Sequence, residues 1–567
     1  MADETQRSEL FANAHDFIER SAALDPLAAT AYGIDRYDDR LTDFSLAHAA
    51  ETREFLRSSL TALAAIVPTD DIDRIGQDVM AERLTATLGL EESGETRRVF
   101  SVLGSPASAI RQVFEIQPAT TAEHAEKIRD RLAGVGAALE SWRGALDEDS
   151  QHGLVAARRQ ALGVAGQLET YSAGAFTERA GRAARSCAVD PETSGLLAAA
   201  ADADRASGEL SGWLRSVYAR RATEDDAVGA ERYRPWAQYF TGAELDLVEI
   251  QQWGWADLTR INARMWEIAA DIAPEARRLV EVADLLDADE DHAVHGTDAL
   301  LHRLRSMTEG AVEMLDGVHF DIDERVRFCD ARLAPEGSAA APYYISPSED
   351  LSRPGTTWFP TLGHDRFSLW RLVSTWYHES VPGHHLQIAT AMLERDRQSR
   401  FQRLEGFVSG YGEGWALYAE RLMEELGAYT DPADEMGYLS CQALRAARIV
   451  VDIGMHLQLP APADIGELAG LGDVAGRPWD VQMAVALLEE RAIEPHDMAT
   501  SEVDRYLGLP GQAISYKVGE RVWLETRSEA RRRLGPAFDL KAWHAHALAL
   551  GPMGLDPFRR EMAAYGH

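Results

Sequence analysis

Residues 376–387 read Trp-Tyr-His-Glu-Ser-Val-Pro-Gly-His-His-Leu-Gln, which places three histidines and a glutamate close together. The apolar pattern on both sides of this stretch is helical. Pro382 has no N–H group, and its ring would clash with the carbonyl of His378, four residues earlier. Gly383 permits backbone angles that other residues avoid. We therefore predict two helical segments joined by a kink or bulge at Pro382 and Gly383.

The spacing of these histidines decides which of them one metal ion can contact. In the HExxH motif of zinc hydrolases, two histidines four residues apart bind the metal and the glutamate activates a water. Here the fourth position after His378 is Pro382, and the next histidines are His384 and His385. On a straight helix His384 would be rotated about 240° around the axis from His378. His385 would share the face of His378 but lie about 10.5 Å further along the axis. A bulge that absorbs two residues makes His384 the ligand, and one that absorbs three makes His385 the ligand.

A third protein ligand is expected further along the chain, because zinc hydrolases commonly use three and keep one position open. Residues 409–420 read Ser-Gly-Tyr-Gly-Glu-Gly-Trp-Ala-Leu-Tyr-Ala-Glu. Glu413 lies between two glycines, so another backbone can approach closely, and it begins an apolar helical pattern. An acidic residue there also suits the helix dipole, which is the alternative interpretation. Glu420 lies two turns further on, where it would support the site or face the surface.

Two more groups are candidates for the same site. Residues 510–519 read Pro-Gly-Gln-Ala-Ile-Ser-Tyr-Lys-Val-Gly, and Tyr516 could donate a hydrogen bond to a developing oxyanion or simply pack in the core. Arg448, Asp452 and His456 follow at four-residue steps and can share one helix face with nearby Arg445. That face forms either a buried ion-pair network or a wall of the site. His456 is a candidate to assist Tyr516, and Asp452 is an alternative ligand or a support for the ligands.

The motifs together resemble one known family, the bacterial domain-of-unknown-function family 885. The resemblance extends over residues 10–565, roughly, and rests on HESVPGHHLQ (378–387), GYGEGWALYAERL (410–422), PGQAISYKVG (510–519), RIVVDIGMH (448–456) and YYISPSEDLSRPG (343–355). That family is usually regarded as related to the gluzincin metallopeptidases. The resemblance implies zinc peptidase chemistry, with His378, His384 and Glu413 as ligands, Glu379 as general base and Tyr516 as the oxyanion donor. The histidine spacing is wider than in gluzincins.

The expected fold is mostly α-helical, with two helical lobes around a deep cleft and a small β element. Ala-, Leu- and Glu-rich segments predict N-terminal helices at 42–67, 72–92, 121–147, 154–172 and 194–222. The lobes would cover residues 1–225 and 226–567, or the chain would form one continuous domain over about 10–565. Residues 335–382 contain six prolines, the first at 335 and the last at 382, and segments 341–346 and 356–361 within this stretch favour short strands. Segment 356–361 is a candidate to pair with a substrate backbone as an added strand.

Composition narrows the partners and the location. The chain has 567 residues, 46% of them hydrophobic, which is ample for a large core. Its formal net charge of −35 disfavours nucleic acid and anionic membranes as partners. Three scattered cysteines do not predict a thiolate metal site or a disulfide framework. The acidic start and the lack of a long apolar run predict a cytoplasmic protein.

The sequence thus predicts a zinc-dependent hydrolase, most simply a peptidase that cleaves short peptides through a metal-activated water and the Glu379 base. Mn²⁺ or Co²⁺ is compatible with the same nitrogen and oxygen ligands. One alternative is a metal-dependent hydrolase of non-peptide amides or esters. Another is a catalytically inactive peptide-binding protein of the same fold.

Overall fold

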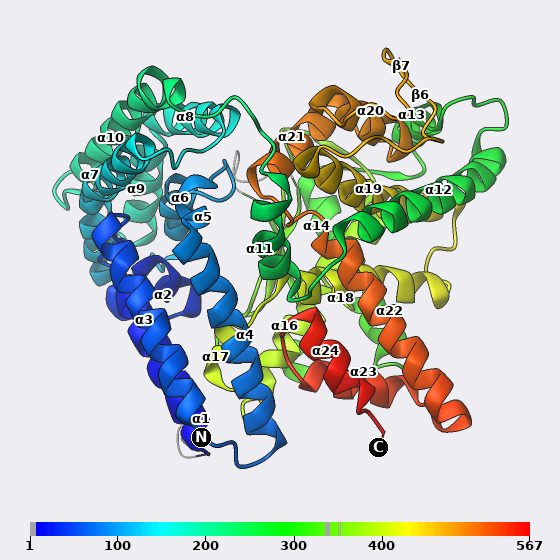
Figure 1. The fold of residues 1–567 in the computed structure, drawn as a ribbon, viewed down its shortest axis with the longest axis horizontal. Helices are drawn as coiled ribbons and strands as arrows, with labels where there is room; N and C mark the ends of the chain where they lie inside the picture. Colours follow the sequence, from blue (N-terminus) through cyan, green and yellow to red (C-terminus); the bar gives the residue numbers. More distant parts are fainter. Residues whose placement is uncertain (1–6, 335–340, 350, 352, 567) are drawn as a thin grey trace. The chain divides into compact units, whose positions relative to one another are not determined.

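The computed structural model describes residues 7–334, 341–349, 351 and 353–566. Pro335, Asp350 and Ser352, which belong to segments discussed above, lie outside the described residues. The fold is mostly α-helical with a small β element, as predicted (Figure 1). No helix in the described part of the chain is long and apolar enough to cross a membrane.

The chain divides into two compact units, each of which is described by itself. The first contains the described residues up to Thr69, together with Leu84–Val228 and Leu507–Leu509. The second contains Asp70–Arg83, Gly229–Tyr506 and the described residues from Pro510 onward. Helix α4 (Asp71–Ser93) therefore contributes to both units.

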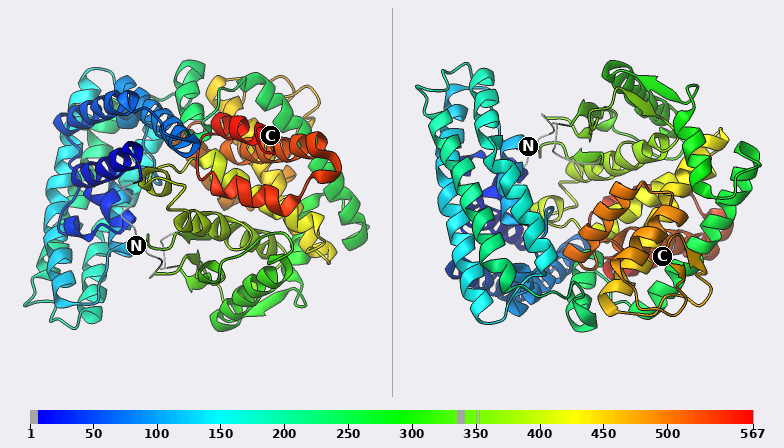
Figure 2. Two further views of the ribbon diagram at one scale, coloured as in Figure 1. Left: turned by 90° about the horizontal axis from the view of Figure 1, so that it is seen from below. Right: turned by 90° about the horizontal axis from the view of Figure 1, so that it is seen from above.

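The described residues of the first unit form helices and connecting loops without a named β-strand, and helices α7 to α10 lie side by side (Figure 2). Buried alanines such as Ala200 and Ala203 let α10 pack closely against α7, α8 and α9. The five helices predicted from the sequence correspond to α3, α4, α7, α8 and α10. The elements besides α4 are α1 (Glu9–Leu24), α2 (Pro26–Tyr32), η2 (Asp35–Tyr37), α3 (Leu46–Ala65), α5 (Glu95–Arg98), α6 (Pro106–Ile116), α7 (Ala122–Gln151), α8 (Arg158–Ser172), α9 (Ala175–Ser186), α10 (Leu196–Ser216) and η3 (Tyr218–Arg220).

The second unit holds every candidate site residue. Its helices are α11 (Gly229–Thr241), α12 (Leu247–Ile272), α13 (Leu279–Ala288), α14 (Thr297–Leu315), η4 (Glu324–Val326), α15 (Leu372–Glu379), α16 (His384–Leu393), α17 (Arg400–Leu404), α18 (Ser409–Glu425), α19 (Pro432–Leu457), α20 (Val481–Arg491), α21 (His496–Gly508), α22 (Ser515–Leu534), η5 (Gly535–Ala537), α23 (Leu540–Ala549) and α24 (Leu555–Ala563). Helix α12 packs along α19, and α18 packs along α22 (Figure 1).

Glycines set the distance between α18 and α22. A Cβ atom on Gly414 would lie 2.5 Å from the backbone of Gly519, and one on Gly519 would lie 2.0 Å from the Gly410 carbonyl oxygen. These positions therefore require glycine, and the close approach brings Glu413 on α18 next to Tyr516 on α22. The glycines that flank Glu413 in the sequence thus allow close packing, as their spacing suggested.

Three small sheets complete the second unit. Strands β2 (Asp330–Leu333), β4 (Thr356–Phe359) and β3 (Tyr343–Ile345) form one sheet in that order, β1 (Ala293–His295) pairs with β5 (Arg366–Ser368), and β6 (Glu467–Leu468) pairs with β7 (Gly472–Asp473). Ala331 and Phe367 pack with Leu304 of α14 and Trp376 of α15, so two of the sheets support the first histidine-bearing helix.

The predicted use of segment 356–361 as a partner for a substrate strand is wrong. Strand β4 is the central strand of its sheet, parallel to β2 on one side and antiparallel to β3 on the other. Both of its backbone edges are therefore occupied, and the free edges of the sheet belong to β2 and β3. The sequence gives the extended conformation of a strand but not its place in the sheet order.

Candidate metal centre

The stretch 376–387 forms two helices with a break, as the Pro-Gly pair predicts. Helix α15 ends at Glu379 and α16 begins at His384, so the break is complete rather than a bulge within one helix. Backbone N–H groups still bridge it, because Gly383 donates to the Tyr377 carbonyl at 3.0 Å and His385 donates to the Ser380 carbonyl at 3.1 Å. The two helices therefore keep a fixed relation to each other.

Gly383 is needed at the break for space rather than for a left-handed backbone. Its φ is −71°, which other residues also adopt. A Cβ atom there would lie only 1.9 Å from the His378 carbonyl oxygen. Trp415 of α18 fixes the same turn, since its indole N–H donates to the carbonyls of Pro382 at 2.9 Å and Gly383 at 3.2 Å.

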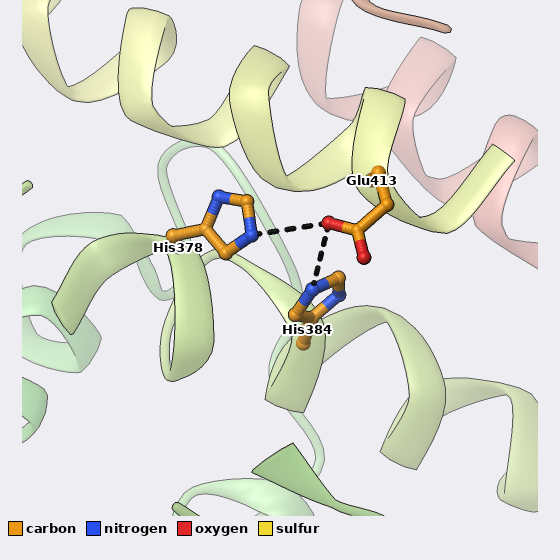
Figure 3. A group of neighbouring side chains, drawn as sticks. All are labelled: His378, His384 and Glu413. Atoms are coloured by element: carbon orange, nitrogen blue, oxygen red, sulfur yellow. Dashed lines mark hydrogen bonds and ion pairs between the residues drawn. The ribbon is translucent and has the colours of Figure 1, made fainter. Parts of the chain in front are cut away.

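The break brings His378 and His384 together with Glu413 (Figure 3). The two imidazole rings lie edge to face with their centroids 4.8 Å apart. Glu413 Oε2 lies 3.2 Å from Nε2 of His378 and 3.4 Å from Nε2 of His384. One ligand atom from each of the three residues lies within 4.8 Å of the others.

This donor set fits a zinc ion. Two nitrogen or oxygen ligands at about 2.0–2.1 Å from a tetrahedral zinc lie about 3.3 Å from each other. The two contacts of Glu413 Oε2 with the histidine nitrogens, 3.2 and 3.4 Å, match that spacing. Two imidazoles and one carboxylate also leave a fourth coordination position, which is typical of catalytic zinc sites.

Electrostatics couple the two histidines to Glu413. Burial lowers the pKa of the His378 imidazole, but hydrogen bonds to Glu413 and Glu420 outweigh this effect and raise it to about 9. Burial raises the pKa of the Glu413 carboxyl, whereas both histidines lower it more strongly, well below its usual range. A cation between these groups would replace the protons that now link them.

Glu420 supports His378 rather than facing the surface. It is fully buried, and its Oε1 accepts a hydrogen bond from Nδ1 of His378 at 2.8 Å. Ser374 of α15 donates to Oε2 at 2.6 Å. Tyr429 donates to Ser374 Oγ at 3.2 Å and to the Glu420 carbonyl at 3.3 Å. Sequence reasoning missed Ser374, although it lies one turn before His378 on the same helix face.

His385, the alternative ligand, points away from Glu413. Its Nε2–H donates to the Val326 carbonyl at 2.8 Å, and its Nδ1 accepts from the Tyr344 hydroxyl at 3.0 Å. Burial lowers the pKa of the His385 imidazole to about 4, so the ring is neutral. Both ring nitrogens are thus used, and His385 ties α16 to η4 and β3.

Glu379 lies next to His378 in sequence and is 8% exposed. Burial raises the pKa of its carboxyl, Glu413 adds to this effect, and His378, His384 and Arg445 oppose it. Its carboxyl makes no hydrogen bond to any group in the described ranges. It is therefore available to exchange a proton.

Tyr516 lies beside the same histidine. Its ring stacks on that of His378 with centroids 6.4 Å apart and an angle of 19°. The Tyr516 ring also contacts Arg448, whose guanidinium lies 4.6 Å from the ring centre. Burial and the Glu413 carboxylate raise the pKa of the phenol, which keeps it protonated as a hydrogen-bond donor.

His456 and Asp452 form a separate polar group and do not join the metal ligands. His456 Nε2–H donates to the Tyr506 carbonyl at 3.0 Å, and Asp452 Oδ2 accepts from the Tyr233 hydroxyl at 2.6 Å. Along α19, His456 lies about 12 Å beyond Arg448, because a helix rises 1.5 Å per residue. The expected assistance of His456 to Tyr516 is therefore wrong, and so is ligation by Asp452.

No curated protein matches the chain. Two solved structures of the same fold span essentially its whole length. One is a "putative lipoprotein" from Colwellia psychrerythraea, 22% identical with a TM-score of 0.86, covering 100% of this chain and 99% of that one. The other is a "putative lipoprotein of unknown function" from Shewanella oneidensis, 19% identical with a TM-score of 0.73, covering 98% and 99%.

One family model matches residues 26–562, which include all the motifs and most of both units. Its description is "Bacterial protein of unknown function (DUF885)". The chain therefore belongs to this family of bacterial proteins of unknown function.

Proposed function

We propose that the protein is a zinc-dependent hydrolase that cleaves short peptides. His378, His384 and Glu413 would hold the zinc, and Glu379 would be the general base. The observation that carries the proposal is the convergence of three ligand atoms within 4.8 Å. Next to these ligands lies the buried carboxyl of Glu379, which has no hydrogen-bond partner among the described residues. Mn²⁺ and Co²⁺ suit the same donors.

A zinc ion held by His378, His384 and Glu413 would supply a Lewis acid and would lower the pKa of a bound water toward ~7. Glu379, a buried carboxyl next to the ligand His378, takes a proton from the attacking water as general base. It then delivers that proton to the leaving amine. The protonated Tyr516 hydroxyl donates to the oxyanion of the tetrahedral intermediate.

Peptides are the proposed substrates. The same mechanism of acyl hydrolysis would also cleave other amides and esters. The retained Glu379 favours an enzyme over an inactive binding protein, because a binding site needs no buried carboxyl beside the ligands. Short peptides are the proposed size class, consistent with the implied relation to peptidases.

The test compares the wild-type protein with Glu379→Gln. Elemental analysis after zinc is supplied should find about one zinc per chain in both proteins. The wild type should cleave members of a mixed peptide library, and the variant should lose this activity by at least ~10²-fold, the lower end of general-base effects. Glu424→Gln is the matched control, because Glu424 is an exposed glutamate on α18.

Two results would overturn the proposal. A wild-type protein that binds no zinc would exclude the mechanism, and normal cleavage by Glu379→Gln would exclude the assigned base. Small amides and esters assayed in parallel identify a non-peptide hydrolase. Zinc binding without hydrolysis of any of these substrates favours the binding protein.

We also propose a cytoplasmic location. The two structural neighbours are named as lipoproteins, so the alternative is a protein held at a membrane by a lipid. Fractionation of cells that express the native gene tests this. Recovery in the membrane fraction would contradict the cytoplasmic proposal.

A further inference from the structure

A small pocket of the second unit lies where α13 packs against both α12 and α20 (Figure 1). Its volume is about 130 Å³, and none of its lining residues belongs to the candidate metal centre. One large aromatic residue of α12 and three arginines, two just before α13 and one at the end of α20, line it: Trp266, Arg277, Arg278 and Arg491. Three cationic side chains thus share one pocket with an indole ring.

These three arginines are not paired with carboxylates. None of them forms an ion pair in the described part of the chain, although Asp and Glu outnumber Lys and Arg by 92 to 57. Arg491 donates through Nη2 to the Ile465 carbonyl at 3.1 Å, and its Nε is buried without a partner among the same residues. Arg277 and Arg278 are exposed. The positive charge at the pocket is therefore not balanced by ion pairs.

The acidic side chains near the pocket bond to backbone groups instead. Glu490, which lines the pocket, accepts from the Ala469 N–H group. Glu281 Oε2 accepts from the backbone N–H groups of Arg277 at 2.8 Å and Arg278 at 3.4 Å. The lining thus carries three cations and one carboxylate. It attracts an anion locally, within a chain whose net charge of −35 repels anions elsewhere.

A phosphate group is the anion that suits these cations. The planar guanidinium forms paired hydrogen bonds with phosphate oxygens, and its charge does not depend on pH in the physiological range. Leu279 and Val280, the first residues of α13, also line the pocket. The first N–H groups of a helix favour a bound phosphate, so this end of α13 adds to the attraction of the arginines.

Trp266 offers a surface for an aromatic ring. It is 39% exposed, and its indole makes no aromatic or cation–π contact with the rest of the described chain. Bases of nucleotides stack readily on such rings, because every base has a flat π-face. A ligand that uses both the arginines and Trp266 carries phosphate and an aromatic base in one molecule.

We propose that this pocket binds a nucleotide, with its phosphate groups on Arg277, Arg278 and Arg491 and its base stacked on Trp266. The site is separate from the metal centre, so the proposal goes beyond the proposed function and does not depend on it. A nucleoside offers only the base and an inorganic phosphate only the charge, and each should bind less tightly than the complete nucleotide.

Calorimetry on the full chain tests this with ADP, adenosine and pyrophosphate. ADP should bind about 10-fold or more tightly than either of the other two, because each of them lacks one of the recognised groups. The double variant Arg277→Gln/Arg278→Gln should lower the affinity for ADP and for pyrophosphate by about 10- to 100-fold. Arg531→Gln/Arg532→Gln is the matched control, because it removes two exposed arginines of α22 and the same charge.

Trp266→Leu separates the base from the phosphates. It should lower the affinity for ADP by about 10-fold and leave pyrophosphate binding unchanged. Each titration is run on chelator-treated protein and on protein loaded with zinc and dialysed, and the affinity for ADP should be the same in both. Urea unfolding should show that the exposed arginines can be replaced without loss of the fold.

Several results would overturn the proposal. These are no binding of ADP at millimolar concentration, unchanged ADP affinity in Arg277→Gln/Arg278→Gln, an equal loss in the α22 control, and ADP binding that requires zinc. Adenosine that binds as tightly as ADP would exclude recognition of the phosphates. Pyrophosphate that binds as tightly as ADP would exclude recognition of the base.

Discussion

Oε1 of Glu420 lies 2.8 Å from Nδ1 of His378, on the far side of the ring from Glu413. A carboxylate in this position keeps the proton on Nδ1 and directs the lone pair of Nε2 toward the proposed metal position. Ser374 and Tyr429 hold Glu420 in turn. The ring orientation of His378 is therefore fixed before any ligand arrives.

We expect Glu420→Gln to lower zinc affinity by about 10- to 100-fold, the usual effect of losing a carboxylate that orients a ligand histidine. The amide can still accept a hydrogen bond but no longer carries the charge that strengthens it. Competition with a zinc-binding dye measures the affinity. Glu424→Gln, on an exposed position of the same helix, should bind zinc as the wild type does. An unchanged affinity in Glu420→Gln would show that Glu420 has no influence on the ligand.

The sequence predicted the parts of this site that depend on local chemistry. Pro382 and Gly383 predicted the break between α15 and α16. The pattern after Glu413 predicted a helix, but α18 begins at Ser409, so Glu413 lies beyond its first turn and the helix-dipole interpretation of Glu413 is wrong. The sequence did not predict the hydrogen bonds of His385 to Tyr344 and Val326, because those contacts depend on how distant segments pair. Periodicity identifies a face of a helix but not the element that this face contacts.

The misplacement of His456 has the same cause. A four-residue step correctly indicated a shared face with Arg448 and Asp452. Helix α19 is 26 residues long, however, so one face contacts different neighbours along its length. Arg448 contacts the Tyr516 ring and the Tyr506 hydroxyl, whereas His456 bonds to the backbone carbonyl of Tyr506. The sequence spacing therefore identified the residues that share one face of α19. It did not identify which of them lie next to the candidate metal centre.

Asp452 predicts an unusual dependence of stability on pH. Burial raises the pKa of its carboxyl from 3.8 to about 7, although hydrogen bonds from Tyr233 and Gly511 oppose this. The folded state thus holds a proton that the unfolded state releases above pH ~4. The contribution of Asp452 to the free energy of unfolding decreases as the pH rises from about 4 to about 7, and it is constant above that range.

Asp452→Asn removes this titration and keeps an acceptor for Tyr233. Relative to the wild type, the variant should gain stability by as much as about 1.4 kcal/mol per pH unit between pH 5 and 7. Urea unfolding of both proteins at pH 5, 6, 7 and 8 measures the difference. A difference that is independent of pH would show that Asp452 titrates near its ordinary pKa.

Tyr516→Phe tests the oxyanion donor. Loss of one such donor typically lowers kcat by about 10²–10³-fold, and KM should change little because the bond strengthens only in the transition state. Zinc content should stay the same, since the ring that stacks on His378 remains. Tyr377→Phe is the control, because Tyr377 lies beside His378 in the chain but packs against Tyr429. An unchanged kcat in Tyr516→Phe would make Tyr516 a packing residue.

The two adjacent histidines of α16 give the sharpest test of the metal site. His384→Ala removes a proposed ligand and should abolish stoichiometric zinc binding, measured by elemental analysis after dialysis against equimolar zinc. His385→Ala should retain about one zinc per chain, because both nitrogens of His385 already bond to Tyr344 and Val326. It should instead lower the free energy of unfolding by about 1–3 kcal/mol, since it leaves a buried carbonyl and hydroxyl unpaired. Zinc loss in His385→Ala with zinc retained in His384→Ala would mean that the break between α15 and α16 absorbs three residues rather than two.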